Sequence, residues 1–384
     1  MRLLVAARVV DRLGGFTLAF LPLLLVASYG ASLRTAGLVG AAFGVATIPS
    51  RLLGGRLADR LGRRTTIVLG LCGCAAAQAV LAVAPGLPLA LVGAVALGLC
   101  FEVYEPPSQA LLADLTPPDQ RAAAYSALGA ALAGAAVVAG LLAALLAGAG
   151  LRWLFAADAA TCLACALVVR LLLPAAGTVE PHRPQRRARP WRDPRLRAML
   201  VAGTGFATVY LTMLVGLPLA LHDQHAAPAW AGVLVAVSAV TVIGGRRLRL
   251  TRATDPFARM RTGYTLLAVG LALAALAAGA SALTPDAALP GAAYLLPVVV
   301  WSLGDVVLLG EPFAVVAGLA PDAERGRYLA AYGVSWGVAT TLAPVLAAGL
   351  LARGGPTLLW GACAAVAGVL AVTLSRVRTA VTRR

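Results

Sequence analysis

The sequence predicts an all-α polytopic membrane protein with twelve transmembrane helices in two pseudo-symmetric six-helix bundles. Of its 384 residues, 60% are hydrophobic and only 12% are charged, whereas roughly 25% of the residues in a soluble globular protein are charged. The mean hydropathy is +0.86. The apolar residues also fall into uncharged runs, most of them close to the length of about 20 residues that crosses a bilayer as a helix.

The count of helices follows from these runs. They lie at 13–33, 35–50, 65–101, 122–151, 198–222, 224–245, 262–285, 287–304, 328–352 and 354–375. The run 65–101 is too long for one span, and Pro85, Gly86 and Pro88 interrupt it, so it is expected to hold two helices. Residues 153–173 supply one more helix, whose embedded Asp158 is expected to reach water near the outer end.

Six helices then lie on each side of a polar segment. The N-terminal bundle is predicted over 1–173, a basic linker over 174–196 and the C-terminal bundle over 197–384. The linker is rich in arginine and proline, but it has no interleaved aromatic residues on a fold, so nucleic-acid binding is not expected.

Arginine gives the orientation in the membrane. All 32 basic residues are arginine. With twelve helices, all but Arg34, Arg152 and Arg353 lie on the side that holds both termini and the linker. Because positive residues are retained in the cytoplasm during insertion, both termini are predicted to be cytoplasmic.

The two halves contain related segments. The stretch from Tyr104 to Tyr125, with Glu105-Pro106, is echoed by the stretch from Gly310 to Tyr332, with Glu311-Pro312. Both end one span, cross a short turn and open the next helix. A parallel duplication of a six-helix unit explains this, and secondary transporters are often built that way, with the substrate site near midplane between the halves.

A second motif lies in the turn after the second helix, Gly55 to Arg64. It resembles the signature of the major facilitator superfamily between helices two and three. The resemblance implies a conformational latch formed by Gly55, Asp59, Arg60, Gly62, Arg63 and Arg64. Independently of it, glycine at 62 permits a tight turn, and the arginines suit an anionic membrane surface, so a basic anchor alone is the alternative.

The segment from Pro107 to Arg121 resembles the connection between helices four and five of bacterial multidrug exporters in this superfamily. The resemblance implies a monomeric, multi-pass transporter in the bacterial plasma membrane, which exports lipophilic small molecules or antibiotics in exchange for protons. A proton-coupled symporter that imports a sugar, peptide or other metabolite is the alternative. The family's Gly-Pro motif is absent from helix five, and its nearest equivalent is Ala343-Pro344 in helix eleven.

Ionisable residues within membrane spans are costly and are often functional. Such acids, with one nearby aromatic residue, are the candidates for proton coupling or for lining the substrate cavity: Glu102, Glu105, Asp305, Glu311, Trp301 and Asp11. Glu102 and Glu105 are three residues apart and are expected to share one helix face. For Glu105 and Glu311, structural pairing with arginines is the alternative; for Trp301 it is packing, and for Asp11 it is an ion pair with Arg8 and Arg12.

Three prolines are candidates for kinks or gates. Pro106 and Pro312 each follow a repeat-related glutamate, and Pro344 lies within a span. Because proline lacks the amide hydrogen that bonds to the carbonyl four residues back, the helices are expected to bend there.

Other classes fit less well. A membrane prenyl or glycosyl transferase needs clustered metal-binding acids or a catalytic histidine, and the sequence offers neither. Without lysine there is no Gly-x-x-x-x-Gly-Lys phosphate loop, so no built-in ATP motor and no cofactor are expected. His222 and His225 flank Asp223, but a solvated loop explains them, and no metal site is predicted.

Overall fold

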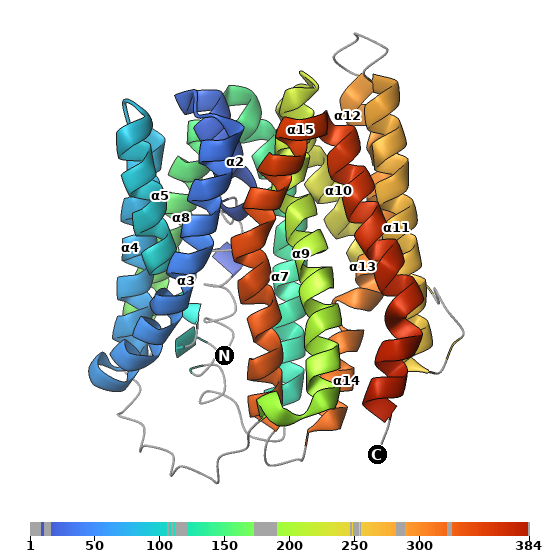
Figure 1. Cartoon of the computed structure of the whole chain (residues 1–384). Coiled ribbons are helices and arrows are strands. Elements are labelled where there is room, and N and C mark those ends of the chain that lie inside the picture. The colour runs from blue at the N-terminus through green and yellow to red at the C-terminus, as the bar shows by residue number, and fades with distance from the viewer. Residues whose placement is uncertain are drawn as a thin grey trace. The chain divides into compact units, whose positions relative to one another are not determined.

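Helices make up the protein in the computed structural model, and no strand lies among the residues it describes (Figure 1). These residues are 9–10, 17–105, 107–108, 111, 121–172, 190–245, 248, 253, 255–281, 289–320 and 325–382. The helices are α2 (Thr17–Tyr29), α3 (Leu33–Leu61), α4 (Arg63–Val83), α5 (Leu87–Phe101), α7 (Arg121–Ala149), α8 (Leu151–Leu172), η2 (Pro190–Arg192), α9 (Pro194–Asp223), α10 (Ala229–Gly245), α11 (Pro256–Ser281), α12 (Leu289–Ala293), α13 (Leu295–Leu308), α14 (Glu311–Leu319) and α15 (Arg325–Thr382).

Seven helical segments in the described part of the chain are long and apolar enough to cross a membrane. Shorter apolar helices accompany them at Ala19–Tyr29, Leu87–Phe101, Gly134–Ala149 and Ala229–Gly245. The all-helical membrane fold is therefore confirmed, while the count of twelve spans stays a prediction.

Breaks in the long apolar runs lie at glycine and proline. The run 65–101 forms two helices, α4 and α5, and Pro88 stands in the first turn of α5. Proline fits there because the first amides of a helix have no partner within it. In α15, Gly354 and Gly355 leave the helical conformation, Gly355 with φ of +62°, so α15 consists of two arms, 325–353 and 356–382.

The chain divides into two compact units. Unit 1 comprises Met1–His182 and Pro228–Ala236, and unit 2 comprises Arg183–Ala227 and Val237–Arg384. In unit 1, α4 packs against α8 and α5, and α3 packs against α5. In unit 2, α9 and α11 pack against α15, and α11 packs against α13. The bundle boundaries at 173 and 197 stay a prediction.

Asp158 is not where it was expected. It is 3% exposed, and the expectation that it reaches water is wrong. The reason is tertiary, because α8, which carries Asp158, packs closely against α4.

Helices α11 and α13 of unit 2 approach each other through glycine. A Cβ atom on Gly270 would lie 2.5 Å from the backbone nitrogen of Trp301, and one on Gly304 would lie 2.7 Å from the carbonyl oxygen of Gly263. These distances are shorter than van der Waals contact. Helices α11 and α13 therefore touch backbone to backbone, as small residues allow in membrane proteins.

Asp193 fixes the start of α9 to the start of α15. Its carboxylate caps α9 by accepting from the Arg195 amide at 2.9 Å, and it accepts from the Tyr328 hydroxyl at 3.0 Å. Burial alone raises the pKa of Asp193, but hydrogen bonds from Arg195 and Tyr328 and the charge of Arg195 outweigh burial, so the net pKa lies below its ordinary value.

This depressed pKa gives a testable pH dependence. The unfolded chain binds the Asp193 proton more tightly than the folded one, so the stabilisation is present above the ordinary aspartate pKa of about 3.9. It is lost as the pH falls through the lower pKa of the folded state. We expect Asp193→Asn to remove this part of the acid destabilisation, measured by thermal unfolding between pH 3 and pH 7. An unchanged pH dependence in the variant contradicts the assignment.

Candidate functional site

The centre of the candidate site is Asp305, on α13. The residue is 2% exposed, and its Oδ1 atom has no hydrogen-bond partner among the described residues. One turn earlier on the same helix, Ser302 donates to the Ser238 hydroxyl of α10 at 2.8 Å. A carboxylate in such surroundings needs a proton or a cationic group to compensate its charge.

Trp301 lies on the same face of α13, four residues before Asp305. It is 3% exposed, and its ring centroid is 5.8 Å from that of Trp360. Trp360 in turn donates its indole hydrogen to the Tyr294 hydroxyl at 2.9 Å. The structure thus puts Trp301 in packed surroundings, which agrees with the packing interpretation of this residue.

A second aromatic cluster in unit 2 joins α9, α11 and α15. It consists of Phe206, Tyr210, Tyr264 and Trp336, and the ring centroids of its touching pairs are 5.6 to 6.2 Å apart. The Tyr264 hydroxyl is buried and has no hydrogen-bond partner among the described residues. Phe206 and Tyr264 are buried, whereas Tyr210 and Trp336 are half-buried, so the cluster is apolar and partly accessible at its Tyr210 and Trp336 edge.

Glu311 stands at the first position of α14, where the helix breaks. α13 ends at Leu308, and the chain turns through Leu309 and Gly310 before α14 begins with Pro312 in its first turn. The Glu311 carboxylate accepts two hydrogen bonds from Arg259, from Nε at 2.8 Å and from Nη2 at 2.9 Å. This bidentate pair is the structural alternative that the sequence left open.

The pair predicts a stability effect that separates the two roles of Glu311. Glu311→Gln is expected to cost about 2 kcal/mol, because hydrogen bonds to charged groups are strong. The exchanged variant, Arg259→Glu with Glu311→Arg, is expected to recover much of this loss in thermal unfolding. A Glu311→Gln protein with unchanged stability but altered proton coupling contradicts the structural role.

In unit 1, Glu102 and Glu105 lie beyond the end of α5. The prediction that Glu102 and Glu105 share one face of a helix is wrong, because α5 ends at Phe101 and the chain turns at Glu102. The Glu102 amide donates to the Ser50 hydroxyl at 3.0 Å, and its carboxylate lies 3.9 Å from Arg51. Gly54 lies against this turn, since a Cβ atom there would approach the Val103 carbonyl oxygen to 2.3 Å.

The predicted latch occupies the turn between α3 and α4. Gly62 has φ of +80° and separates Leu61 of α3 from Arg63 of α4. Its carbonyl accepts both the amide and the hydroxyl of Thr66, at 3.2 and 2.9 Å. Arg60 is exposed, Gly55, Arg63 and Arg64 are half-buried, and the side chain of Asp59 lies outside the described part.

The remaining candidates are spread out. Pro344 lies buried within the first arm of α15, close to Thr340, whose hydroxyl donates to the Trp336 carbonyl at 2.8 Å. Asp11 and Pro106 lie outside the described residues. No group of three metal-ligating side chains lies among the residues that the structure describes.

The sequence analysis missed the role of glycine at these helix contacts. Gly263 and Gly270 are seven residues apart, which places both on one face of α11. That spacing, small residues two turns apart in a membrane helix, is the signal from which this contact is predictable.

A sequence profile of the Major Facilitator Superfamily matches residues 5–310. The chain belongs to this superfamily. An uncharacterized MFS-type transporter of Bacillus subtilis strain 168, YhjO, is 26% identical over 351 residues, which cover 87% of this chain and 82% of YhjO.

Two further relatives carry more specific names. The multidrug resistance protein MdtH of Klebsiella pneumoniae strain 342 is 28% identical over 214 residues, 54% of this chain and 53% of MdtH. A probable actinorhodin transporter of Streptomyces coelicolor is 28% identical over 275 residues, 70% of this chain and 43% of the relative. The matches therefore span about half of MdtH and less than half of the actinorhodin transporter.

Solved structures share the major facilitator fold. An auto-inhibited peptide transporter of the POT family matches with a TM-score of 0.79 at 16% identity, covering 100% of this chain and 97% of that one. A mutant of the nucleoside transporter NupG matches with a TM-score of 0.79 at 14% identity, and the match covers 98% of each chain. The major facilitator protein described here is thus a multi-pass secondary transporter of small molecules and not an enzyme.

Proposed function

We propose that this transporter exports lipophilic small molecules by exchanging them for protons, through alternating access between the two bundles. The observation that carries the proposal is the buried carboxyl of Asp305, one oxygen of which has no partner among the described residues. An ionised residue at the centre of a membrane helix costs roughly 2.5–3.5 kcal/mol on insertion scales. A proton on Asp305 avoids this cost while the site is empty, and a cationic substrate that displaces the proton compensates the carboxylate in its place.

The lipophilic nature of the substrate is supported by the aromatic cluster of Phe206, Tyr210, Tyr264 and Trp336. Rings from three helices gather in unit 2, and the Tyr210 and Trp336 side chains at one edge of the cluster are only half-buried. The names of two relatives, a multidrug resistance protein and a probable actinorhodin transporter, support export of such molecules.

The turn at Gly62 is proposed to act as the conformational latch, in a monomer whose termini are cytoplasmic.

The test is proton flux in proteoliposomes with an acidified lumen. A panel of lipophilic cations, neutral macrocycles, sugars, dipeptides and nucleosides is added in turn, and the internal pH is followed. Proton release on adding a lipophile, at a rate that depends on its concentration, is the expected result. Proton movement with a sugar, dipeptide or nucleoside but with none of the lipophiles overturns export and indicates symport.

A further inference from the structure

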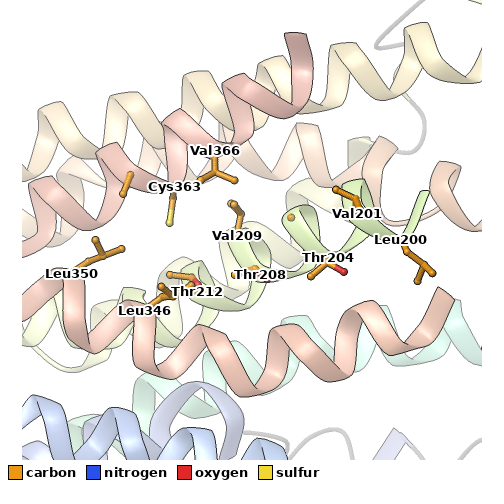
Figure 2. Close-up of a pocket in the computed structure, with 12 residues that line it drawn as sticks. Leu200, Val201, Thr204, Thr208, Val209, Thr212, Leu346, Leu350, Cys363 and Val366 are labelled. Atoms are coloured by element: carbon orange, nitrogen blue, oxygen red, sulfur yellow. The ribbon is translucent and has the colours of Figure 1, made fainter. Parts of the chain in front are cut away.

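Unit 2 contains a pocket that is separate from Asp305 and from the aromatic cluster. It has a volume of about 590 Å³ and lies along α9 and both arms of α15. Figure 2 shows Thr204, Thr208 and Thr212 on α9, with Leu346 on one arm of α15 and Cys363 on the other. Pockets of about 300–1,000 Å³ hold drug-sized molecules.

The lining restricts the charge of a ligand. None of the twelve lining residues is charged, and most are aliphatic. Around the pocket, Val201 is 74% exposed and Val366 is 44% exposed, which gives it an apolar rim suited to the hydrocarbon layer. A charged phospholipid headgroup finds no counter-charge here, whereas a neutral molecule dissolved in the bilayer meets no barrier.

Three threonines on one stripe of α9 supply the polar part of the lining. They are four residues apart, so their hydroxyls follow one line along the helix. Thr212 is 2% exposed, and its Oγ1 atom has no hydrogen-bond partner among the described residues. Elsewhere, Thr241 and Thr340 donate to the carbonyl four residues back, at 2.8 Å in both cases. Thr212 does not, so its buried hydroxyl lies at the wall of the pocket without a partner among the described residues.

We infer that this pocket binds an uncharged amphipathic small molecule, with an aliphatic or ring body and a hydroxyl or carbonyl group that pairs with Thr212. The body packs against Leu346, Leu350 and Val366, and its polar group satisfies a buried hydroxyl that otherwise lacks a partner. A lipid tail has no group for the threonine stripe, so the occupant is a neutral amphipath and not an acyl chain.

The test uses photolabelling of the full chain in phosphatidylcholine nanodiscs with 3-azioctanol, a neutral alcohol that carries a diazirine. Labelled positions are mapped by mass spectrometry. We expect saturable labelling of the lining residues on α9 and α15, reduced about fivefold by Thr212→Val because one hydrogen bond is lost. Thr241→Val, which removes a hydroxyl outside the pocket, is the matched control and is expected to leave the labelling unchanged. Ala362→Phe is expected to block labelling by filling the space.

Three results overturn the proposal. One is labelling no stronger in the pocket than at Leu276 and Val372, which are 70% and 79% exposed. Another is labelling that does not respond to Thr212→Val. The third is equal labelling, also insensitive to Thr212→Val, by a phosphatidylcholine with a diazirine in its acyl chain, which identifies lipid tails as the occupant. Because binding is measured without a pH gradient, failure of proton-coupled export does not affect the outcome.

Discussion

Asp305→Asn is expected to reduce transport driven by a pH gradient by about 100-fold, equivalent to about 2.7 kcal/mol, because the coupling carboxyl is lost. Asparagine has nearly the same shape but cannot exchange a proton. Substrate exchange at equal concentrations on both sides, which needs no net proton movement, is therefore expected to continue. The measurement compares gradient-driven flux with exchange in the same proteoliposomes.

A matched control comes from the other unit. Asp158 on α8 is also buried, at 3% exposure. Transport by the Asp158→Asn variant is expected to depend on the pH gradient as in the unchanged protein. Asp305→Glu, which restores a carboxyl, is expected to recover part of the coupled transport. If Asp305→Asn transports with the proton dependence of the unchanged protein, Asp305 is not the coupling residue.

Gly270→Val is expected to destabilise the protein by about 3 kcal/mol, the upper part of the range for overpacking a core. A Cβ atom at this position would lie 2.5 Å from the Trp301 nitrogen and 2.8 Å from its Cβ atom. Since most of the atoms it meets belong to the backbone, α11 and α13 have to separate to accommodate it. The measurement is thermal unfolding of purified protein in detergent.

The control for this change is Gly361→Val in the second arm of α15, where a Cβ atom meets nothing within 4 Å. It introduces the same β-branched residue into a helix without a clash. Equal stability of the two variants contradicts the backbone contact between α11 and α13.

Patterns along the sequence predicted the elements well, because hydropathy and helix breakers act locally. The division of 65–101 into α4 and α5 followed from Pro85, Gly86 and Pro88, and the break in α15 lies at the boundary between the runs 328–352 and 354–375. The thickness of the hydrocarbon layer sets the length of an uncharged run. Such runs therefore locate the membrane helices without any knowledge of which helices pack against each other.

The side-chain partners were not predictable in the same way. Nothing near Glu311 in the sequence indicates that Arg259, 52 residues away, holds its carboxylate. The end of α5 at Phe101 likewise depends on a tertiary contact, because the Glu102 amide donates to Ser50 on α3. The burial of Asp305 and its unpartnered Oδ1 atom also depend on the helices packed around α13. A hydropathy profile does not show which helices these are.

The break at Gly354 and Gly355 makes α15 a pair of helical arms that are connected at one end. Its two arms are joined by two glycines only, and Figure 1 shows them diverging from this junction. Such a short joint holds the ends of the two arms close together. The pocket draws Leu346 and Leu350 from one arm and Ala362 and Cys363 from the other, all within a few turns of the joint. An occupant there would contact both arms near the point where they join, so the conformation of Gly354 and Gly355 sets the width of the pocket.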